Sequence, residues 1–268
     1  MIRAGVTGAA GRMGSLIIRG VVESEDMEIA GALEAPNHPC VGSDVGAVIG
    51  GGQRGVKISD ALEAAFETTD VIIDFTFPEA TVKTARYAAF AGKAMVIGTT
   101  GFTDGEADEI RSCAQYIPIV AAPNMSIGVN VMFKVVSLLA SLLGEDYDVE
   151  IVESHHRLKK DAPSGTAMGI ARAVAQVRGE DIRALARYER HGMIGPRPKG
   201  EIGIQTIRAG DIVGDHTVYF AGNNERIEIT HRAHTRQNFA QGAIRAARWV
   251  QGKAPGMYSM MDVLGLEP

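Results

Sequence analysis

The amino-acid sequence predicts an α/β protein with a parallel-sheet domain, followed by an α+β domain whose sheet is mostly antiparallel. Three observations support this prediction. Short apolar runs alternate with helical patterns through the first half of the chain. A glycine-rich turn joins the first apolar run to the first helical pattern. Beyond a long apolar segment, 127–143, turn residues rather than helices separate most of the apolar runs.

Composition limits the class of protein. The 268 residues are 46% hydrophobic and 22% charged, which is typical of globular domains. Lys and Arg number 27 against 32 Asp and Glu, so the net charge of −5 does not favour nucleic acid or an anionic membrane. Cys40 and Cys113 lack a CxxC spacing, which predicts reduced thiols. We expect neither a signal peptide nor a run of about 18 apolar residues, and therefore a cytoplasmic protein.

The first predicted strand, Ile2–Val6, runs into a glycine turn that precedes a helical pattern at Leu16–Val22. Gly8, Gly11 and Gly14 form a G-x-x-G-x-x-G pattern. Small residues at these positions let the backbone approach a pyrophosphate, which the N-terminus of the helix favours. The spacing differs from the commoner G-x-G-x-x-G, and a tight turn without a ligand is the alternative.

The second predicted strand, Glu28–Leu33, is followed by Glu34, about 20 residues beyond Gly14. An acidic residue there accepts hydrogen bonds from the adenosine ribose and repels a 2′-phosphate. The next residue is Ala35 rather than a cation. This local sequence favours NADH over NADPH, and a surface glutamate in a turn is the alternative.

Further strands and helices complete the predicted parallel sheet. Residues 36–54 are expected to form an irregular loop, and Ser59-Asp60 to cap a helix that ends at Phe66. The remaining elements are strands Val71–Phe75, Ala94–Ile97 and Ile117–Ala121 and helix Pro78–Ala91. Loops 98–101 and 122–125 follow two of these strands, and ligands bind at that edge of an open sheet. Plain turns are the alternative for both loops.

The second half begins with a predicted helix, Ile127–Leu143. Its later elements are helix Ala167–Val177, strands Ile202–Arg208, His216–Phe220 and Arg226–His231, a hairpin turn at 222–224 and an exposed loop at 195–200. Helix Asn238–Val250 is expected to return to the first domain. The predicted domains are therefore 1–126 with 236–268, which binds a dinucleotide, and 127–235, which binds substrate and carries a sheet suited to self-association.

Residues 153–166 hold the densest group of chemically active side chains. Two histidines and three cations stand between an apolar run at Val149–Val152 and the helix. The backbone N–H groups of Ser164, Gly165 and Thr166 open that helix, where negative charge is favoured. We interpret the cluster as an anion-holding catalytic site. A solvated loop between a strand and a helix is the alternative.

Six segments then occur in an order that is specific to one family. They are Val6–Gly14, Gly98–Phe102, Asn124–Asn130, Glu153–Lys159, Asp161–Ala167 and Arg208–Gly214. Together they resemble the 4-hydroxy-tetrahydrodipicolinate reductase family, also called dihydrodipicolinate reductase, of bacterial and plant lysine biosynthesis. The resemblance covers essentially the whole chain, and the His-His cluster with the Asp-Ala-Pro-Ser-Gly-Thr run is its most specific part.

The resemblance implies a Rossmann-like first domain and NAD(P)H-dependent reduction of 4-hydroxy-tetrahydrodipicolinate to tetrahydrodipicolinate with loss of water. It implies His155 as proton donor and Lys159 as second catalytic residue, with His156, Gly165 and Thr166 holding the carboxylates of a small dicarboxylate substrate. The implied cofactor contacts are Gly8, Ala9, Ala10, Gly11, Arg12, Met13, Glu34, Gly98, Thr99, Thr100, Ala122, Pro123, Asn124 and Met125. It also implies a homotetramer. Some members carry a basic residue where this chain has Ala35, so use of both NADH and NADPH remains open.

Two rival functions were weighed. A metal-dependent hydrolase could use His155, His156, His231 and His234, but adjacent strand residues face opposite ways and no H-E-x-x-H spacing occurs. No metal site is therefore predicted. A non-catalytic dinucleotide-binding regulator would bind the cofactor without turnover, and the His155–Lys159 pair argues against it.

Overall fold

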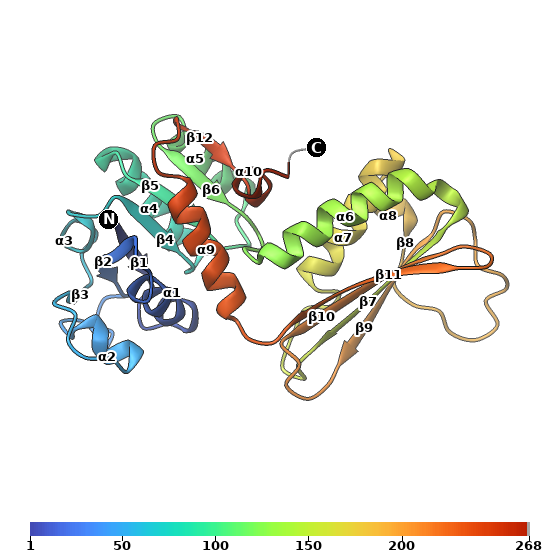
Figure 1. Cartoon of the computed structure of the whole chain (residues 1–268), viewed down its shortest axis with the longest axis horizontal. Helices are drawn as coiled ribbons and strands as arrows, with labels where there is room; N and C mark the ends of the chain where they lie inside the picture. Colours follow the sequence, from blue (N-terminus) through green and yellow to red (C-terminus); the bar gives the residue numbers. More distant parts are fainter. Residues whose placement is uncertain (267–268) are drawn as a thin grey trace. The chain divides into compact units, whose positions relative to one another are not determined.

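The computed structural model describes residues 1–266, which form two compact units (Figure 1). Unit 1 comprises Met1–Ile127 and the returning segment 236–266, and unit 2 comprises Gly128–Thr235. Positions 267 and 268 of the predicted first domain lie outside the described residues. Unit 2 is therefore an insertion between two parts of unit 1.

Unit 1 is built on a seven-stranded parallel sheet in the order β12-β6-β5-β4-β1-β2-β3. The central strands are short and mostly apolar because helices cover both faces of the sheet. The strands are β1 (Ile2–Thr7), β2 (Met27–Leu33), β3 (Ile58–Ser59), β4 (Val71–Asp74), β5 (Ala94–Ile97), β6 (Pro118–Ala121) and β12 (Gly256–Tyr258). The predicted Rossmann-like sheet is confirmed.

Seven helices accompany this sheet. They are α1 (Arg12–Val22), α2 (Val45–Ile49), α3 (Leu62–Phe66), α4 (Pro78–Ala91), α5 (Asp104–Cys113), α9 (Gln237–Trp249) and α10 (Met260–Leu264). One face packs with α1 and α9, and the other with α3, α4 and α5. A Cβ at Gly20 would lie 2.5 Å from the Ile244 side chain, so glycine permits the close approach of α1 and α9.

Three sequence predictions in unit 1 need correction. The helix expected from Ser59-Asp60 begins only at Leu62, because Ser59 belongs to β3 and pairs with Leu33. The loop 36–54 is not wholly irregular, since Asp44 accepts a hydrogen bond from Gly46 N at 2.8 Å and caps α2. Helices α5 and α10 and strand β12 were not predicted.

Unit 2 is built on a five-stranded sheet in the order β11-β10-β7-β9-β8. Its strands are β7 (Asp148–His155), β8 (Ala186–Arg187), β9 (Ile202–Arg208), β10 (Gly214–Ala221) and β11 (Arg226–Ala233), and its helices are α6 (Ile127–Leu143), η1 (Gly144–Asp146), α7 (Gly165–Arg178) and α8 (Ile182–Leu185). Strand β10 runs antiparallel to both β7 and β11, while β9 runs parallel to β7 and β8. The antiparallel strand pairs join more residues than the parallel ones, so the sheet is mostly antiparallel, as predicted.

The two faces of β7 differ because successive strand residues point to opposite sides. Val149 and Ile151 are buried with α6 and α7, and we call this the covered face. Further along the strand, Glu153 and His155 continue the same alternation. The covered face is therefore apolar at one end and polar at the other.

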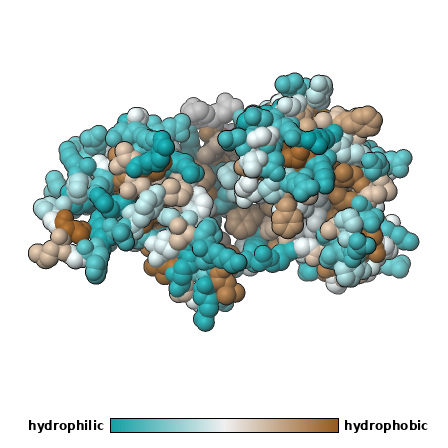
Figure 2. All heavy atoms as spheres, turned by 180° about the vertical axis from the view of Figure 1, so that it is seen from behind, coloured by the Kyte–Doolittle hydropathy of each residue, from teal (hydrophilic) through white to brown (hydrophobic). Residues whose placement is uncertain are grey.

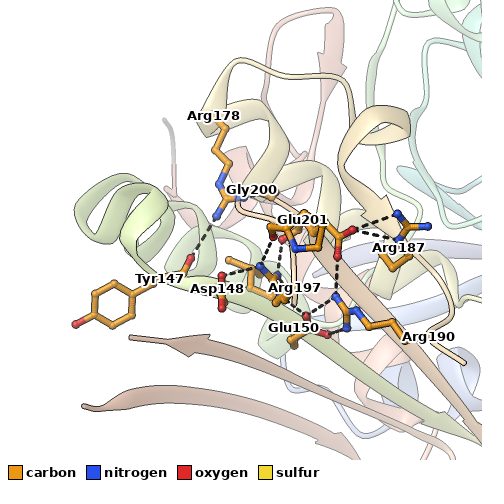
Figure 3. A network of polar contacts seen from close by, with 11 residues as sticks. Tyr147, Asp148, Glu150, Arg178, Arg187, Arg190, Arg197, Gly200 and Glu201 are labelled. Atoms are coloured by element: carbon orange, nitrogen blue, oxygen red, sulfur yellow. Dashed lines mark hydrogen bonds and ion pairs between the residues drawn. The ribbon is translucent and has the colours of Figure 1, made fainter. Parts of the chain in front are cut away.

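The opposite face of β7, here the open face, carries a second polar network (Figure 3). Arg190 and Arg197, from the segment before β9, both donate hydrogen bonds to Glu150. The Glu150 carboxylate lies over Gly203 of β9, where a Cβ would come within 1.9 Å of it. These contacts attach residues 188–201 to the sheet.

The expectation that the chain lacks a long apolar run needs qualification at α6. Residues Ile127–Asp146 are long and apolar enough to cross a membrane by length and composition, a property shared by core helices of soluble proteins. Met132, Val136 and Ala140 of this helix are buried in the core of unit 2. On the face drawn in Figure 2, hydrophobic residues form separate small groups among hydrophilic ones.

Candidate active site

His155 is the last residue of β7 and is almost fully buried. Its Nδ1 lies 2.6 Å from Oε2 of Glu153, two residues earlier on the same face. Its other ring nitrogen, Nε2, lies over Gly214 of β10, where a Cβ would be 3.0 Å from it. The ring is therefore held at Nδ1, and the glycine leaves space beside Nε2.

Glu153 is the centre of this cluster, and its side chain is 0% exposed. Five polar groups meet its two oxygens. Oε1 accepts from Ser164 N (3.0 Å), Thr206 Oγ1 (3.2 Å) and Arg208 Nη2 (2.9 Å). Oε2 accepts from Arg208 Nη1 (2.8 Å) and is the oxygen in contact with His155 Nδ1. Burial alone raises the pKa of a carboxyl, but the hydrogen bonds from His155 and Arg208 outweigh it and lower the pKa of Glu153 to about 2.

His216, on β10, lies beside His155, and the two ring centroids are 5.2 Å apart in an edge-on arrangement. Its Nε2 is 2.9 Å from Ser164 Oγ, the side chain that caps α7. Burial, followed by the neighbouring His155, lowers the pKa of His216 to about 3. His216 is therefore neutral near pH 7 and links the sheet to the start of the helix.

The loop after β7 carries the other predicted residues. Lys159 forms an ion pair with Asp161 at 3.0 Å, and the hydrogen bond from Lys159 lowers the pKa of Asp161. His155 and Lys159 thus have separate partners. His156 is half-buried, and its carbonyl accepts from Lys159 N at 3.1 Å. Arg208 holds the loop by donating to the Asp161 carbonyl at 2.7 Å.

The N-terminus of α7 differs from the prediction in one respect. Ser164 N–H donates to Glu153, so it stabilises an internal carboxylate rather than facing a ligand. Ser164 Oγ accepts from Ala167 N at 3.1 Å and caps the helix. Gly165 is exposed and Thr166 is half-buried at the first helical positions. The anion-binding end of the helix therefore begins at Gly165.

The glycine turn of unit 1 fits a pyrophosphate. Gly8 has φ +58, a left-handed conformation that favours glycine, and Gly11 N donates to the Gly8 carbonyl at 2.9 Å. A Cβ at Gly14 would lie 2.0 Å from that carbonyl oxygen. Gly11 occupies the N-cap of α1 and offers no side chain there. The helix N-terminus thus lies open to an anion, with Ala9, Ala10, Arg12 and Met13 around it.

Glu34 lies beside this turn at the carboxyl end of β2. One carboxylate oxygen accepts from Ala10 N at 2.9 Å, and the other from Ala35 N at 3.0 Å. Glu34 is thus in contact with the glycine turn.

Asp74, at the carboxyl end of β4, joins the neighbouring loops and was not singled out from the sequence. It is fully buried, and its Oδ1 accepts from Thr76, Thr81 and Thr99 Oγ1 at 2.8, 2.8 and 2.9 Å. Gly98 lies against the Phe75 ring, where a Cβ would be 2.2 Å away. Loop 98–100 is therefore fixed to loop 75–77, and Thr100 is exposed next to them.

Loop 122–125 follows β6 at the same edge of the sheet, so all the predicted cofactor residues lie in unit 1. Asn124 Oδ1 accepts from Ser126 N at 2.8 Å, which shapes the turn. A Cβ at Gly242 of α9 would lie 1.7 Å from the Met125 carbonyl oxygen. The returning helix therefore packs tightly on this loop, with Ala122 buried and Pro123 exposed.

A glycine turn at the edge of a parallel sheet in one unit, and a carboxylate-bound histidine beside a helix N-terminus in the other, define a dinucleotide-dependent oxidoreductase. The comparisons with known proteins agree. Family models described as "Dihydrodipicolinate reductase, N-terminus" and "Dihydrodipicolinate reductase, C-terminus" match residues 2–125 and 128–264. The chain therefore belongs to the dihydrodipicolinate reductase family of NAD(P)H-dependent oxidoreductases.

Full-length relatives support this assignment. The 4-hydroxy-tetrahydrodipicolinate reductases of Citrifermentans bemidjiense and Syntrophus aciditrophicus are 56% and 53% identical to this chain, covering 99% of it and 100% and 99% of their own lengths. A dipicolinate-bound dihydrodipicolinate reductase from Paenisporosarcina sp. TG-14 has a TM-score of 0.79 at 27% identity, with 98% of each chain covered. The resemblance inferred from the sequence motifs is confirmed.

Sequence reasoning missed the partners of His155. Glu153 and Arg208 stood within the quoted motifs without a role, and His216 was treated only as a strand residue. Buried charge inside an apolar alternation was the available signal for Glu153. Among residues 1–266, no group of three or more His, Cys, Asp or Glu side chains could hold a metal ion.

Proposed function

We propose that the chain reduces 4-hydroxy-tetrahydrodipicolinate to tetrahydrodipicolinate with NAD(P)H and loss of water, as a step of diaminopimelate and lysine biosynthesis. The observation that carries the proposal is the Glu153–His155 pair beside the N-terminus of α7, in a chain of this family. The relatives' names and the dipicolinate-bound neighbour support a small cyclic dicarboxylate as substrate.

In this proposal the cofactor lies along the carboxyl edge of the unit 1 sheet. Gly8, Ala9, Ala10, Gly11, Arg12 and Met13 hold the pyrophosphate, Glu34 holds the ribose, and Gly98, Thr99, Thr100, Ala122, Pro123, Asn124 and Met125 line the remainder. The bound nicotinamide supplies the hydride. The protein residues bind it, orient it and exclude water.

Unit 2 then handles the substrate and its proton. Gly165 and Thr166, at the start of α7, bind one carboxylate through backbone N–H groups and the helix dipole, and His156 binds the carboxylates as well. His155 donates the proton that the reduced ring requires, acting as a general acid. Lys159 stabilises developing negative charge or assists the protonation.

The choice of cofactor is proposed from Glu34 and Ala35. A carboxylate next to the ribose repels a 2′-phosphate, and Ala35 contributes no compensating cation. NADH is therefore favoured, with NADPH also used. We further propose a cytoplasmic homotetramer that associates through the open face of the unit 2 sheet. Among the described residues of unit 2, the helices pack on the covered face and leave the open face without a helix.

The test is the decay of NADH or NADPH absorbance with substrate made in situ from pyruvate and aspartate semialdehyde by a coupled synthase. Oxidation of both cofactors, with the lower KM for NADH, is expected. Oxidation of NADPH alone would support the proposed reaction and reject the preference for NADH that was argued from Glu34 and Ala35. Cofactor binding without any oxidation would instead favour a non-catalytic dinucleotide-binding regulator.

His155→Gln and Lys159→Ala should lower kcat much more than substrate affinity, and a wild-type rate would remove that residue from the mechanism.

A further inference from the structure

The hydrogen bonds around Glu153 determine where the proton of the His155–Glu153 contact resides. All four other partners of the carboxylate are donors: Ser164 N, Thr206 Oγ1 and two nitrogens of Arg208. A carboxylate surrounded in this way is held ionised, and the low pKa of Glu153 agrees with that. The 2.6 Å contact must therefore be a hydrogen bond donated by His155 Nδ1–H.

This assignment determines the chemistry of the second ring nitrogen. A neutral imidazole carries one proton, so a proton on Nδ1 leaves Nε2 with its lone pair, and protonation of the ring places the transferable proton on Nε2. The space beside Nε2 is kept by Gly214, which lacks a side chain. One nitrogen is thus anchored and the other is available.

We propose that Glu153, held by Arg208, is the positioning residue of the reaction: it fixes His155 in the Nδ1–H form and directs Nε2 to the substrate. This inference rests on the proposed function, because it assigns Glu153 an effect through the proton donor. Glu153 itself touches no reacting atom in this proposal. Its effect resembles that of a carboxylate that orients a catalytic histidine in other enzymes.

The contacts of Glu153 also hold His155 in one position in the absence of substrate. Glu153 joins two strands and a helix N-terminus, since Thr206 and Arg208 lie on β9, His155 on β7 and Ser164 at the cap of α7. The cross-strand register places Glu153 between Thr206 and His216, and it pairs His155 with Arg208. The histidine is therefore positioned before substrate arrives, which removes an ordering cost from the reaction.

The decisive variant is Glu153→Gln, which keeps the size of the side chain and removes its charge. The amide has one acceptor oxygen for five donors, and its NH₂ group placed against His155 would require the lone pair at Nδ1. The titratable and charged groups facing this position are His155 on β7, Arg208 on β9 and His216 on β10. The matched control is Glu150→Gln, the same change on the open face of β7.

Nitrogen NMR of full-length protein labelled with ¹⁵N-histidine reports the tautomer directly, without substrate. The His155 signals are assigned by difference from His155→Gln and recorded above about pH 8, where an ordinary imidazole is neutral. We expect the Nδ1–H form in the wild type and in Glu150→Gln, and a shift toward Nε2–H in Glu153→Gln. The Nε2–H form in the wild type would overturn the proposal.

Kinetics provide the second measurement. Glu153→Gln should lower kcat by about 100-fold or more and change KM by less than about threefold, while its pH–rate profile shifts. Glu153→Asp keeps the charge that Arg208 requires and should recover part of the rate, which covers the case in which the glutamine variant does not fold. A wild-type kcat in Glu153→Gln, or a Glu153→Asp variant that is no faster than Glu153→Gln, would refute the positioning role. If the wild-type protein were inactive toward this substrate but His155 had the Nδ1–H tautomer, the proposed function would be rejected and the tautomer assignment would stand.

Discussion

Strand β7 carries two glutamates, each bound by arginine, on its two faces. Glu153 on the covered face is fully buried, whereas the side chain of Glu150 on the open face is 25% exposed. Both have a lowered pKa, because hydrogen bonds to their partners outweigh the effect of burial. The two glutamate–arginine pairs have different roles. Glu153 holds a histidine in place, and Glu150 attaches a loop to the sheet (Figure 3).

The difference follows from water. A carboxylate without solvent must receive all its hydrogen bonds from the protein, so each donor around Glu153 matters for stability. Glu150 can exchange lost partners for water, and surface ion pairs contribute little. Burial, rather than the identity of the partner, therefore decides which cluster is costly to disturb.

The largest expected effect comes from Arg208→Met. Removing the guanidinium leaves the buried Glu153 carboxylate without its two charged donors, which should lower the free energy of unfolding by about 3–5 kcal/mol. Arg190→Met on the open face should cost about 1 kcal/mol or less. Urea unfolding followed by circular dichroism measures the free energy of unfolding of both variants. Equal losses would show that burial does not distinguish the two clusters.

Acid should destabilise the covered face first. The pKa of His216 is about 3 in the folded protein, against an ordinary value of 6.5, so the unfolded chain binds more protons between these values. Stability contributed by neutral His216 is therefore present above pH 6.5 and lost as pH falls toward 3, a loss on the order of a few kcal/mol. The contribution of Glu153 is present above pH 4.5 and is lost as pH falls toward about 2.

Unfolding free energies measured across this range test the assignment. His216→Gln should flatten the pH dependence between 6.5 and 4.5, whereas Glu150→Gln should leave it unchanged. A His216 variant with the wild-type slope in that window would show that another group is responsible.

Two glycines allow a smaller and more local test. Ala at Gly214 adds a methyl 3.0 Å from His155 Nε2 and should lower kcat about tenfold with little loss of stability. Ala at Gly203 adds a methyl 1.9 Å from Glu150 Oε2 and should cost about 1 kcal/mol by displacing the carboxylate, with kcat unchanged. If Gly203→Ala lowered kcat as much as Gly214→Ala, the two faces would not act independently.

The smallest effect is expected from Glu150→Gln. Arg190 and Arg197 keep other acceptors in Glu201, Asp148 and the Val149 carbonyl, so the loss should stay below about 1 kcal/mol. Limited proteolysis should nevertheless cut residues 188–200 faster than in the wild type. An unchanged cleavage rate would mean that Glu150 does not hold this segment.

The sequence predicted what depends on local pattern. Ile127–Leu143 and Ala94–Ile97 form the predicted helix and strand within their stated limits, because apolar periodicity extends over their whole length. The capping box of Thr103 and Glu106 was an equally local signal for α5 that went unused. The failure at Ser59 arose because pairing with β2 outweighed its tendency to cap a helix.

The candidate site was predictable only in part, for a related reason. His155, Lys159 and the Ser164–Thr166 turn lie close together in the sequence, so composition and motif order revealed them. Arg208 reaches Glu153, and His216 reaches Ser164, from strands more than fifty positions away, and their alignment depends on the register of β7 with β9 and β10. A single sequence does not specify that register.

The insertion of unit 2 has a consequence for synthesis on the ribosome. Strand β12, which borders β6 in the unit 1 sheet, and helix α9 both come from the returning segment. A nascent chain that has emerged only through unit 2 therefore exposes the apolar edge of β6, with Ile119 and Val120 uncovered by their final partners. We expect unit 2, a continuous segment, to fold first, while unit 1 is vulnerable to aggregation until the returning segment emerges.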